Sequence, residues 1–299
     1  MNKKALIFGI NGQDGYYLNR LLADHHITVI GVSRSGLVDI KGDVTDYLFV
    51  SNLIKEQQPD YIFHLAANST TRHDALFENF GTICTGTLNI LEAAYQHCPG
   101  SRIFISGSGL QFENKGAPIS ENHAFEARDA YSMARIQSAF AARYYRTKGM
   151  KVYTGYFFNH DSPLRSDRHI NQKIALSAHR IYSGRDDKLS IGDVSVKKEF
   201  TYAGDVVNAI WVLVNNDTVF EATIGSGLAF PISDWLQLCF SRYDLDWRDH
   251  VAITPGFVAE YEVLVADPST IKGLGWQPQL SISGLADMML EHVEKTDVG

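Results

Sequence analysis

Residues 4–24 read K-A-L-I-F-G-I-N-G-Q-D-G-Y-Y-L-N-R-L-L-A-D, and this stretch decides the fold class of the chain. It begins with a short apolar run that ends at glycine, which is typical of a buried parallel strand. Three glycines follow at three-residue spacing, and leucines then recur at helical spacing. The stretch therefore predicts a strand, a glycine turn and a helix, in that order.

The three glycines have separate structural uses. Gly9 permits the tight turn, Gly12 lets the backbone approach a pyrophosphate, and Gly15 lets the helix pack closely on the strand. The amino end of the helix supplies N–H groups and a positive dipole. A purely structural turn is the alternative, but a second strand follows where a dinucleotide-binding unit requires one. We expect six residues of this turn to contact a dinucleotide: Gly9, Asn11, Gly12, Gln13, Asp14 and Gly15.

The second strand indicates which dinucleotide is bound. It reads T-V-I-G-V-S-R-S-G over residues 28–36, so Ser33, Arg34 and Ser35 stand where an NAD site usually carries an acidic residue. A guanidinium with flanking hydroxyls suits a 2′-phosphate through charge-assisted hydrogen bonds. The sequence therefore favours NADP and leaves NAD possible. Arg34 as a solvated surface charge remains the alternative.

Two further strands end in residues suited to the same cofactor. G-D-V-T-D closes a third strand, and P-D-Y-I-F-H-L-A-A forms a fourth whose small terminal residues let a cofactor pass close to the backbone. We expect the adenine to contact the end of the third strand and the rest of the cofactor to contact the end of the fourth. The residues are Asp43 and Val44 on the third strand and Leu65, Ala66 and Ala67 on the fourth.

Strands and helical patterns alternate along the chain, which predicts an α/β protein. We expect a Rossmann-type doubly wound parallel sheet with a smaller α/β carboxyl-terminal domain that binds the substrate. Residues 1–158 form the predicted dinucleotide-binding domain, together with a returning segment near 195–215. Residues 159–299 mainly form the predicted nucleotide-sugar-binding domain.

Composition limits the partners of this chain. The 299 residues carry a formal net charge of −7 with a pI near 5.9, which argues against nucleic acid and anionic membranes as partners. No apolar run approaches about 18 residues, and a strand begins near the amino terminus, so we expect a cytoplasmic protein. The three cysteines are widely spaced and predict free thiols. No histidine pair has metal-ligand spacing, so we expect no metal.

Tyr131 and Arg135 lie four residues apart on a helix predicted to begin near Ala130, and they share one face. A tyrosine exchanges protons usefully when a nearby positive charge stabilises its phenolate. Such a pair is common on protein surfaces, but here it follows a glycine turn and a strand that ends at Ser108. We therefore predict that Ser108, Tyr131 and Arg135 are catalytic, and that Tyr131 and Arg135 also contact the cofactor.

Several segments carry a resemblance that extends almost from end to end of the chain. They are G-I-N-G-Q-D-G-Y-Y-L at the start, F-F-N-H-D-S-P-L-R at 157–165, I-N-Q-K-I at 170–174, K-L-S-I-G-D-V-S-V-K-K-E-F at 188–200 and V-A-D-P-S-T-I-K-G-L-G-W-Q-P at 265–278. With them the chain resembles an extended short-chain dehydrogenase/reductase of the NAD-dependent epimerase/dehydratase family. Within that family it resembles the group of GDP-mannose 4,6-dehydratases and GDP-4-keto-6-deoxy-mannose reductases.

The resemblance implies a nucleotide sugar, GDP-linked, in a cleft between the two domains. Tyr131 would exchange a proton with the sugar 4-hydroxyl while C4 exchanges hydride with nicotinamide, and Ser108 would hydrogen-bond that oxygen. His160 is the histidine most suited to a role. The helix of Tyr131 would build a homodimer or homotetramer. The implied substrate contacts are Asn68, Asn159, Lys173 and Lys198.

Departures from the family pattern matter as much as the matches. Leu110 stands where the dehydratases carry a glutamate that moves protons during elimination of water. Arg135 replaces a lysine, and Lys198 and Phe257 replace two phosphate-binding arginines. Reduction at C4 needs only hydride, one proton and orientation, so an NADP-dependent GDP-4-keto-6-deoxy-hexose reductase is favoured. A dehydratase with an atypical base, and a degenerate binding protein that acts as a sensor, remain the alternatives.

Overall fold

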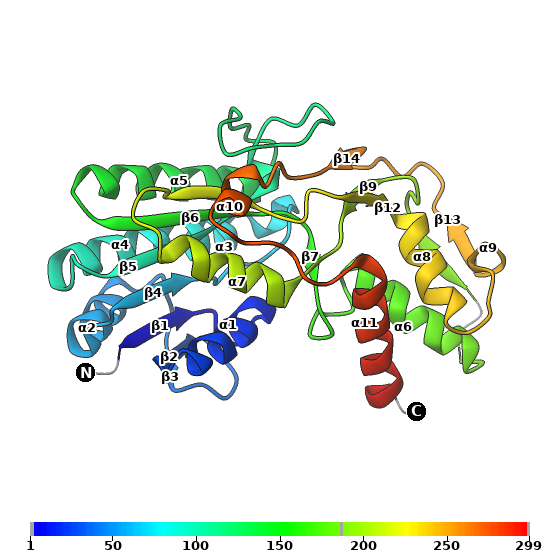
Figure 1. Cartoon of the computed structure of the whole chain (residues 1–299), viewed down its shortest axis with the longest axis horizontal. Coiled ribbons are helices and arrows are strands. Elements are labelled where there is room, and N and C mark those ends of the chain that lie inside the picture. Colours follow the sequence, from blue (N-terminus) through cyan, green and yellow to red (C-terminus); the bar gives the residue numbers. More distant parts are fainter. Residues whose placement is uncertain (1–2, 186–187, 298–299) are drawn as a thin grey trace.

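The computed structural model describes residues 3–185 and 188–297, which form two lobes (Figure 1). The larger lobe holds a seven-stranded sheet in the order β11-β6-β5-β4-β1-β2-β3, with every pairing parallel. This is the order of a doubly wound sheet, so the predicted fold class is confirmed. The strands are β1 Lys4–Phe8, β2 Thr28–Ser33, β3 Ile40–Lys41, β4 Tyr61–His64, β5 Arg102–Ser108, β6 Lys151–Phe157 and β11 Glu221–Ile224.

Helices cover both faces of this sheet. Alternate residues of β1 point to opposite faces, so Ala5 and Ile7 join one core cluster while Leu6 and Phe8 join the other. The first face is covered by α1 Gln13–Asp24, α7 Ala203–Val214 and α10 Ser269–Gly273. The second face is covered by α2 Tyr47–Gln57, α4 Gly86–His97 and α5 Ala130–Thr147. A short helix, α3 Leu76–Asn79, leads through a π-helical segment, Phe80–Thr85, into α4.

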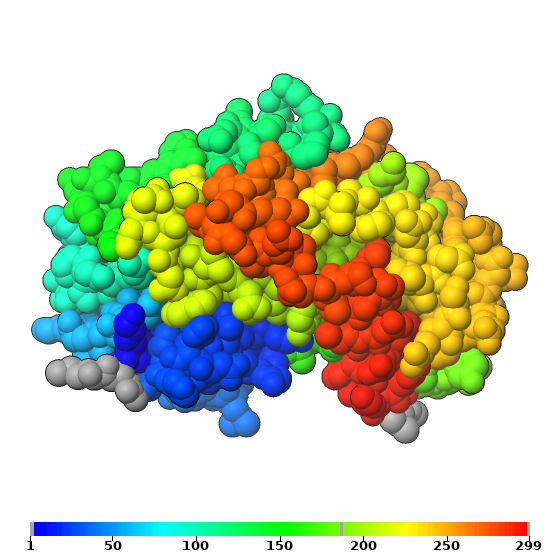
Figure 2. Space-filling view, viewed as in Figure 1, coloured from blue at the N-terminus to red at the C-terminus, as the bar shows by residue number. Residues whose placement is uncertain are grey.

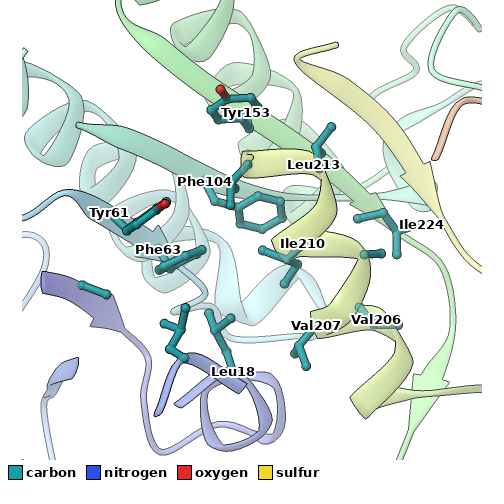
Figure 3. Close-up of a cluster of buried hydrophobic side chains, with 14 of the residues drawn as sticks. Leu18, Tyr61, Phe63, Phe104, Tyr153, Val206, Val207, Ile210, Leu213 and Ile224 are labelled. Carbon is teal, nitrogen blue, oxygen red and sulfur yellow. The ribbon is translucent and has the colours of Figure 1, made fainter. Parts of the chain in front are cut away.

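Helix α7 belongs to the larger lobe although it lies late in the sequence. It packs aliphatic side chains such as Ile210 and Leu213 against aromatic residues of three strands (Figure 3). These buried aromatic residues are Tyr61, Phe63, Phe104 and Tyr153. The chain thus returns to this lobe at α7 and then at β11. The part of the expected return at β9, Lys197–Glu199, lies in the smaller lobe because β9 pairs there with β12 and β14.

The smaller lobe combines helices with short strands. Its helices are α6 Ile170–Tyr182, α8 Ile232–Ser241, α9 Trp247–His250 and α11 Ile282–Thr296. Trp235, Phe240 and Met289 are fully buried between α6, α8 and α11. Its strands and those at the junction are β7 His160–Asp161, β8 Leu189–Ile191, β9, β10 Thr201–Tyr202, β12 Ala229–Pro231, β13 Val251–Ile253 and β14 Val263–Leu264.

The junction of the lobes lies beyond the carboxyl ends of the parallel strands. Strand β7 pairs with β10 at this junction. Figure 2 shows an indentation on one face, between the amino-terminal residues in blue and α11 in red. Over the part of the chain that the structure describes, none of the helices has the length and apolar character needed to span a bilayer.

Candidate active site

The glycine turn lies between β1 and α1 and has the geometry that its spacing predicts. Gly9 adopts φ +94°, and a Cβ atom there would lie 2.6 Å from the backbone nitrogen of Ala66. A Cβ on Gly15 would collide with the carbonyl oxygen of Gly9, so helix and turn are in direct contact. Gly12 caps α1 without a side-chain hydrogen bond. The first N–H groups of α1 therefore remain available to an anion, and this turn fits a pyrophosphate.

A pocket opens beside this turn, and we call it the turn pocket. The ends of β1, β2 and β4 and the segment after β3 form its walls. Eight of the predicted cofactor residues line it: Gly9, Gly12, Arg34, Asp43, Val44, Leu65, Ala66 and Ala67. Asn11 instead donates from its side chain to the carbonyl oxygen of Ser35, at 2.6 Å, and thereby braces the loop that carries Arg34. Thr82 also lines the pocket, and its sequence position had no strand-end signal.

Arg34 is ion-paired across the mouth of the turn pocket. Its guanidinium lies 3.1 Å from the Glu78 carboxylate, and both side chains are about half exposed. Glu78 also accepts a hydrogen bond from Asn68 at 2.9 Å. Asn68, a predicted substrate contact, is therefore held by Glu78 and lines neither the turn pocket nor the pocket that contains Tyr131.

The second pocket, which we call the tyrosine pocket, adjoins the first because Leu65 and Ala67 line both. It gathers residues from six parts of the chain: the start of α1, the segment after β4, the end of β5, α5, the segment that follows β6, and β14. Its lining includes Asp14, Ser106, Ser108, Leu110, Tyr131, Arg135, Asn159, His160, Arg165 and His169. The structure thus brings the predicted catalytic residues together beside the glycine turn.

Local capping fixes the positions of Ser108 and Tyr131. Asp129 caps α5 by accepting from the Ser132 backbone N–H at 2.8 Å, so Tyr131 lies in the first turn of the helix. Ser108 ends β5, and its hydroxyl oxygen accepts from the Leu110 N–H at 3.2 Å. Both side chains are less than a tenth exposed. The end of β5 and the start of α5 therefore place the Ser108 hydroxyl and the Tyr131 phenol in the same pocket.

Arg135 is fixed by contacts to Tyr131 and Ser106. Its guanidinium lies 5.1 Å from the centre of the Tyr131 ring. One terminal nitrogen donates to the Ser106 hydroxyl oxygen at 2.8 Å and also to the Ser106 carbonyl oxygen. Its buried Nε has no hydrogen-bond partner among the described residues. Ser106, which lies two residues before Ser108 on β5, is thus the hydrogen-bond partner of Arg135, the predicted catalytic cation.

The charge of Arg135 also acts on a neighbouring histidine. Burial, reinforced by the Arg135 charge, lowers the pKa of His64 to about 4. His64 is therefore neutral at physiological pH, and Arg135 is the charged member of this pair. The positive charge beside Tyr131 comes from the guanidinium.

A charged pair joins the glycine turn to the segment after β6. His160 Nε2 lies 3.0 Å from the Asp14 carboxylate, and the Ser162 hydroxyl donates to Gln13 at 2.8 Å. Burial disfavours the charged form of His160, but the Asp14 charge and hydrogen bond outweigh it and raise the pKa of His160. Burial likewise opposes ionisation of Asp14, and the His160 charge outweighs it and lowers the pKa of Asp14. Both shifts favour the ion pair near neutral pH.

Three further basic side chains lie in or near the tyrosine pocket. Arg165 lies 3.5 Å from Asp161 and lines the pocket with His169, whose pKa falls to about 4 mainly through burial. Neither residue was predicted, although Arg165 ends the quoted segment 157–165. Burial lowers the pKa of Lys198 to about 8. Lys198 is 6% exposed and its ammonium lies 5.4 Å from the centre of the Phe200 ring, outside the lining of the tyrosine pocket.

A third hollow lies on the smaller lobe, and we call it the Phe257 groove. Lys173, Phe257 and Tyr261 line it, and Lys173 donates to the Ser190 carbonyl oxygen at 3.1 Å. The Tyr261 hydroxyl lies 3.4 Å from the side-chain oxygen of Asn159, which itself lines the tyrosine pocket. The predicted substrate contacts Asn159 and Lys173 are therefore distributed between the tyrosine pocket and the adjoining groove. In residues 3–185 and 188–297, no three His, Cys, Asp or Glu side chains are grouped as a metal site.

Comparison with known proteins agrees with this geometry. A family model described as GDP-mannose 4,6 dehydratase matches residues 6–289. The chain belongs to this family. GDP-mannose 4,6 dehydratase 1 of Arabidopsis thaliana is 26% identical over 97% of this chain and 89% of its own length. GDP-mannose 4,6-dehydratase of Vibrio cholerae is 25% identical over 98% of this chain and 95% of its own length.

Solved structures share the fold of this family member. The structure of RMD from Pseudomonas aeruginosa with NADPH superposes with a TM-score of 0.85 at 20% identity, covering 99% of this chain and 98% of that one. UDP-glucose 4-epimerase of Thermus thermophilus with NAD gives a TM-score of 0.85 at 18% identity, covering 98% of this chain and 99% of that one. The predicted membership of the extended short-chain dehydrogenase/reductases is confirmed. The chain is an enzyme of the nucleotide-sugar dehydratase and epimerase type.

Proposed function

We propose that this enzyme reduces the C4 carbonyl of a GDP-4-keto-6-deoxy-hexose with NADPH. The observation that carries the proposal is the set of groups in the tyrosine pocket that can move a proton. Asp14 is the one carboxylate among the residues lining this pocket, and it is committed to His160. Leu110, two residues beyond Ser108, cannot accept a proton. Reduction needs only the proton of Tyr131, which lies beside Ser108 in this lining, whereas elimination of water would also need a base such as His160 or His169.

The residues support the following chemistry. NADPH, when bound, supplies the hydride that reaches C4. Tyr131 gives its phenolic proton to the carbonyl oxygen, so carbonyl, hydride and proton become an alcohol. Ser108 donates a hydrogen bond that holds this oxygen, and the Arg135 charge stabilises the phenolate that Tyr131 leaves behind. The two pockets share a wall at Leu65 and Ala67, which supports placing nicotinamide and sugar side by side.

NADP is the cofactor that the turn pocket supports best. Arg34 lies at its mouth between two serines, where a guanidinium can pair with a 2′-phosphate. The structure of RMD from Pseudomonas aeruginosa contains NADPH, which adds support. NAD remains the second candidate because the pocket otherwise contacts groups that both cofactors share.

We assign the cofactor to the larger lobe and the nucleotide of the sugar to the smaller one. Guanine as its base rests on the family.

A 4,6-dehydratase activity is the second candidate, since the curated relatives carry that name. The His160–Asp14 pair lies in the same pocket and is the group that such a reaction would have to recruit. A third candidate, a sensor that binds NADP or nucleotide sugar without turnover, draws on Leu110 and Arg135 together.

One assay separates these functions. Purified protein is mixed with NADPH and GDP-4-keto-6-deoxy-mannose, and the loss of NADPH absorbance is recorded. Turnover supports the reductase. Formation of a 4-keto sugar from GDP-mannose without added cofactor supports the dehydratase instead. Tight binding of cofactor with neither reaction, over a panel of 4-keto nucleotide sugars, supports the sensor and contradicts the reductase.

We also propose that the protein self-associates. Helices α4 and α5 expose large apolar side chains next to one another, and these could meet those of a second copy. They are Leu88, Tyr95, Phe140 and Tyr144. Light scattering of the purified protein measures the mass directly. A homodimer or homotetramer is expected, and Tyr144→Lys should shift it toward the monomer.

A further inference from the structure

The tyrosine pocket has an apolar wall whose role is not explained by the transfer of hydride and proton. Leu110 packs against the cluster that contains Tyr131, and it also packs against the cluster that contains Leu264 and Phe158. Leu110 and Leu264 both line the tyrosine pocket. Both also line a neighbouring hollow beside Phe112, as does Thr71, whose hydroxyl donates to Glu260 at 2.7 Å. The two leucines are therefore the apolar part of the boundary between the pockets.

The same pocket also has polar lining residues. Asn159, His160 and Arg165 line it, and each can donate hydrogen bonds to oxygen atoms of a sugar or a phosphate. A sugar ring bound here would therefore meet hydrogen-bond donors as well as the two leucines. The donors match the hydroxyl groups of the ring, and the leucines match an apolar substituent.

The position of Ser108 relates this wall to the reacting carbon. In the proposed function, on which this inference rests, the C4 oxygen lies at Ser108 and Tyr131. Leu110 is held next to them by its N–H bond to the Ser108 hydroxyl. Because C5 and C6 are one and two bonds from C4, the C6 group lies within reach of the side chain that follows Ser108 into the pocket.

We propose that Leu110, backed by Leu264, binds the C6 methyl group of a 6-deoxy sugar and selects against sugars that retain a C6 hydroxyl. A methyl group is removed from water on contact with the two leucines, which favours binding. A hydroxyl in the same place loses water and finds no hydrogen-bond partner on either leucine side chain. The expected preference is about tenfold to a hundredfold, the range for one hydroxyl or methylene in an apolar pocket. Leu110 is in this sense a specificity-determining residue.

The test uses two sugars that differ only at C6, GDP-6-deoxy-mannose and GDP-mannose. Each is titrated by calorimetry into the protein saturated with NADPH, with which neither alcohol can react. The 6-deoxy sugar should bind about tenfold to a hundredfold more tightly. Equal affinities, or tighter binding of GDP-mannose, would overturn the proposal.

Variants of Leu110 test whether this residue causes the preference for the 6-deoxy sugar. Leu110→Asn places a hydrogen-bonding group of similar size at the wall, and it should weaken the preference by strengthening GDP-mannose binding. Leu110→Met keeps an apolar wall and should keep the preference. Leu48→Asn, the same substitution at an exposed site on α2, controls for nonspecific effects. An unchanged preference in Leu110→Asn, with cofactor binding intact, would exclude Leu110 as its source.

This binding measurement is independent of turnover. The oxidation of both sugars by NADP⁺ is measured in parallel, as the reverse of the proposed reaction. Absence of oxidation together with a retained binding preference would count against the reductase function and leave the methyl site standing. Oxidation of both sugars at equal efficiency, with equal affinity, would contradict the methyl site and leave the reductase function standing.

Discussion

The turn pocket and the tyrosine pocket adjoin each other but are built on different principles. The turn pocket consists largely of backbone, glycine and alanine at the ends of neighbouring strands, and its residues are close in sequence to recognisable strand patterns. The tyrosine pocket is assembled from side chains that lie far apart in the sequence, such as Asp14 and His160, which are 146 residues apart. The first pocket recognises what all dinucleotides share. The second holds the predicted catalytic residues and two of the departures from the family pattern, Leu110 and Arg135.

The largest expected effect comes from removing the proton donor in the tyrosine pocket. Tyr131→Phe should lower kcat by about 10²- to 10⁴-fold, because the ring remains and only the transferred proton is lost. NADPH binding, followed by fluorescence, should be retained, whereas Gly12→Val should abolish it. Retained turnover in Tyr131→Phe would remove Tyr131 from the mechanism.

Arg135→Lys should lower kcat/KM by about tenfold to a hundredfold. The ammonium keeps the charge but loses the paired contacts to Ser106, and hydrogen bonds to charged groups contribute about 1.5–3 kcal/mol each. Ser106→Ala alone should cost less because the Ser106 carbonyl oxygen remains. The two substitutions should be non-additive in a double-mutant cycle. A rise in turnover for Arg135→Lys would contradict this expectation and mean that the native arginine gives a lower catalytic rate than lysine does.

The contribution of the His160–Asp14 ion pair to the stability of the protein should depend on pH. The pKa of His160 is raised in the folded protein, so its contribution to stability is present below the unfolded value of about 6.5 and is lost as the pH rises through the folded value. The pKa of Asp14 is lowered, so its contribution is present above about 4 and is lost as the pH falls through the folded value.

His160→Asn should therefore reduce the free energy of unfolding by about 1–2 kcal/mol near pH 6 and by less at higher pH. Urea titrations over a pH series measure this directly. His97→Asn, at a partly buried histidine of α4 that bonds Ser51 and lies away from both pockets, serves as the control. A loss that does not shrink as the pH rises would contradict a contribution from charged His160.

The smallest expected effect is at the mouth of the turn pocket. Glu78→Gln frees Arg34 from an exposed ion pair, and such pairs contribute up to about 1 kcal/mol. The affinity for NADPH should rise by up to about fivefold, and the affinity for NADH should stay unchanged. Arg34→Ala should remove the difference between the two cofactors. An equal change in the affinities for NADPH and NADH would show that Arg34 does not contact the 2′-phosphate.

Much of the molecule was determined by the sequence itself. Glycine spacing and strand periodicity report steric rules that operate over a few residues, which is why the doubly wound sheet and the lining of the turn pocket could be predicted. The four-residue spacing of Tyr131 and Arg135 likewise placed them on one helical face. These features need no knowledge of how distant segments pack.

Other features were decided only by tertiary structure. The pairing of Arg135 with Ser106, of Arg34 with Glu78, and of Leu110 with Leu264 has no signature in sequence spacing, because each depends on how separate elements dock and which side chains they bury together. Leu110 illustrates the division. From the sequence, Leu110 indicated only that a base is missing at this position. The fold packs Leu110 against the cluster that contains Leu264, and the two leucines give the tyrosine pocket an apolar surface.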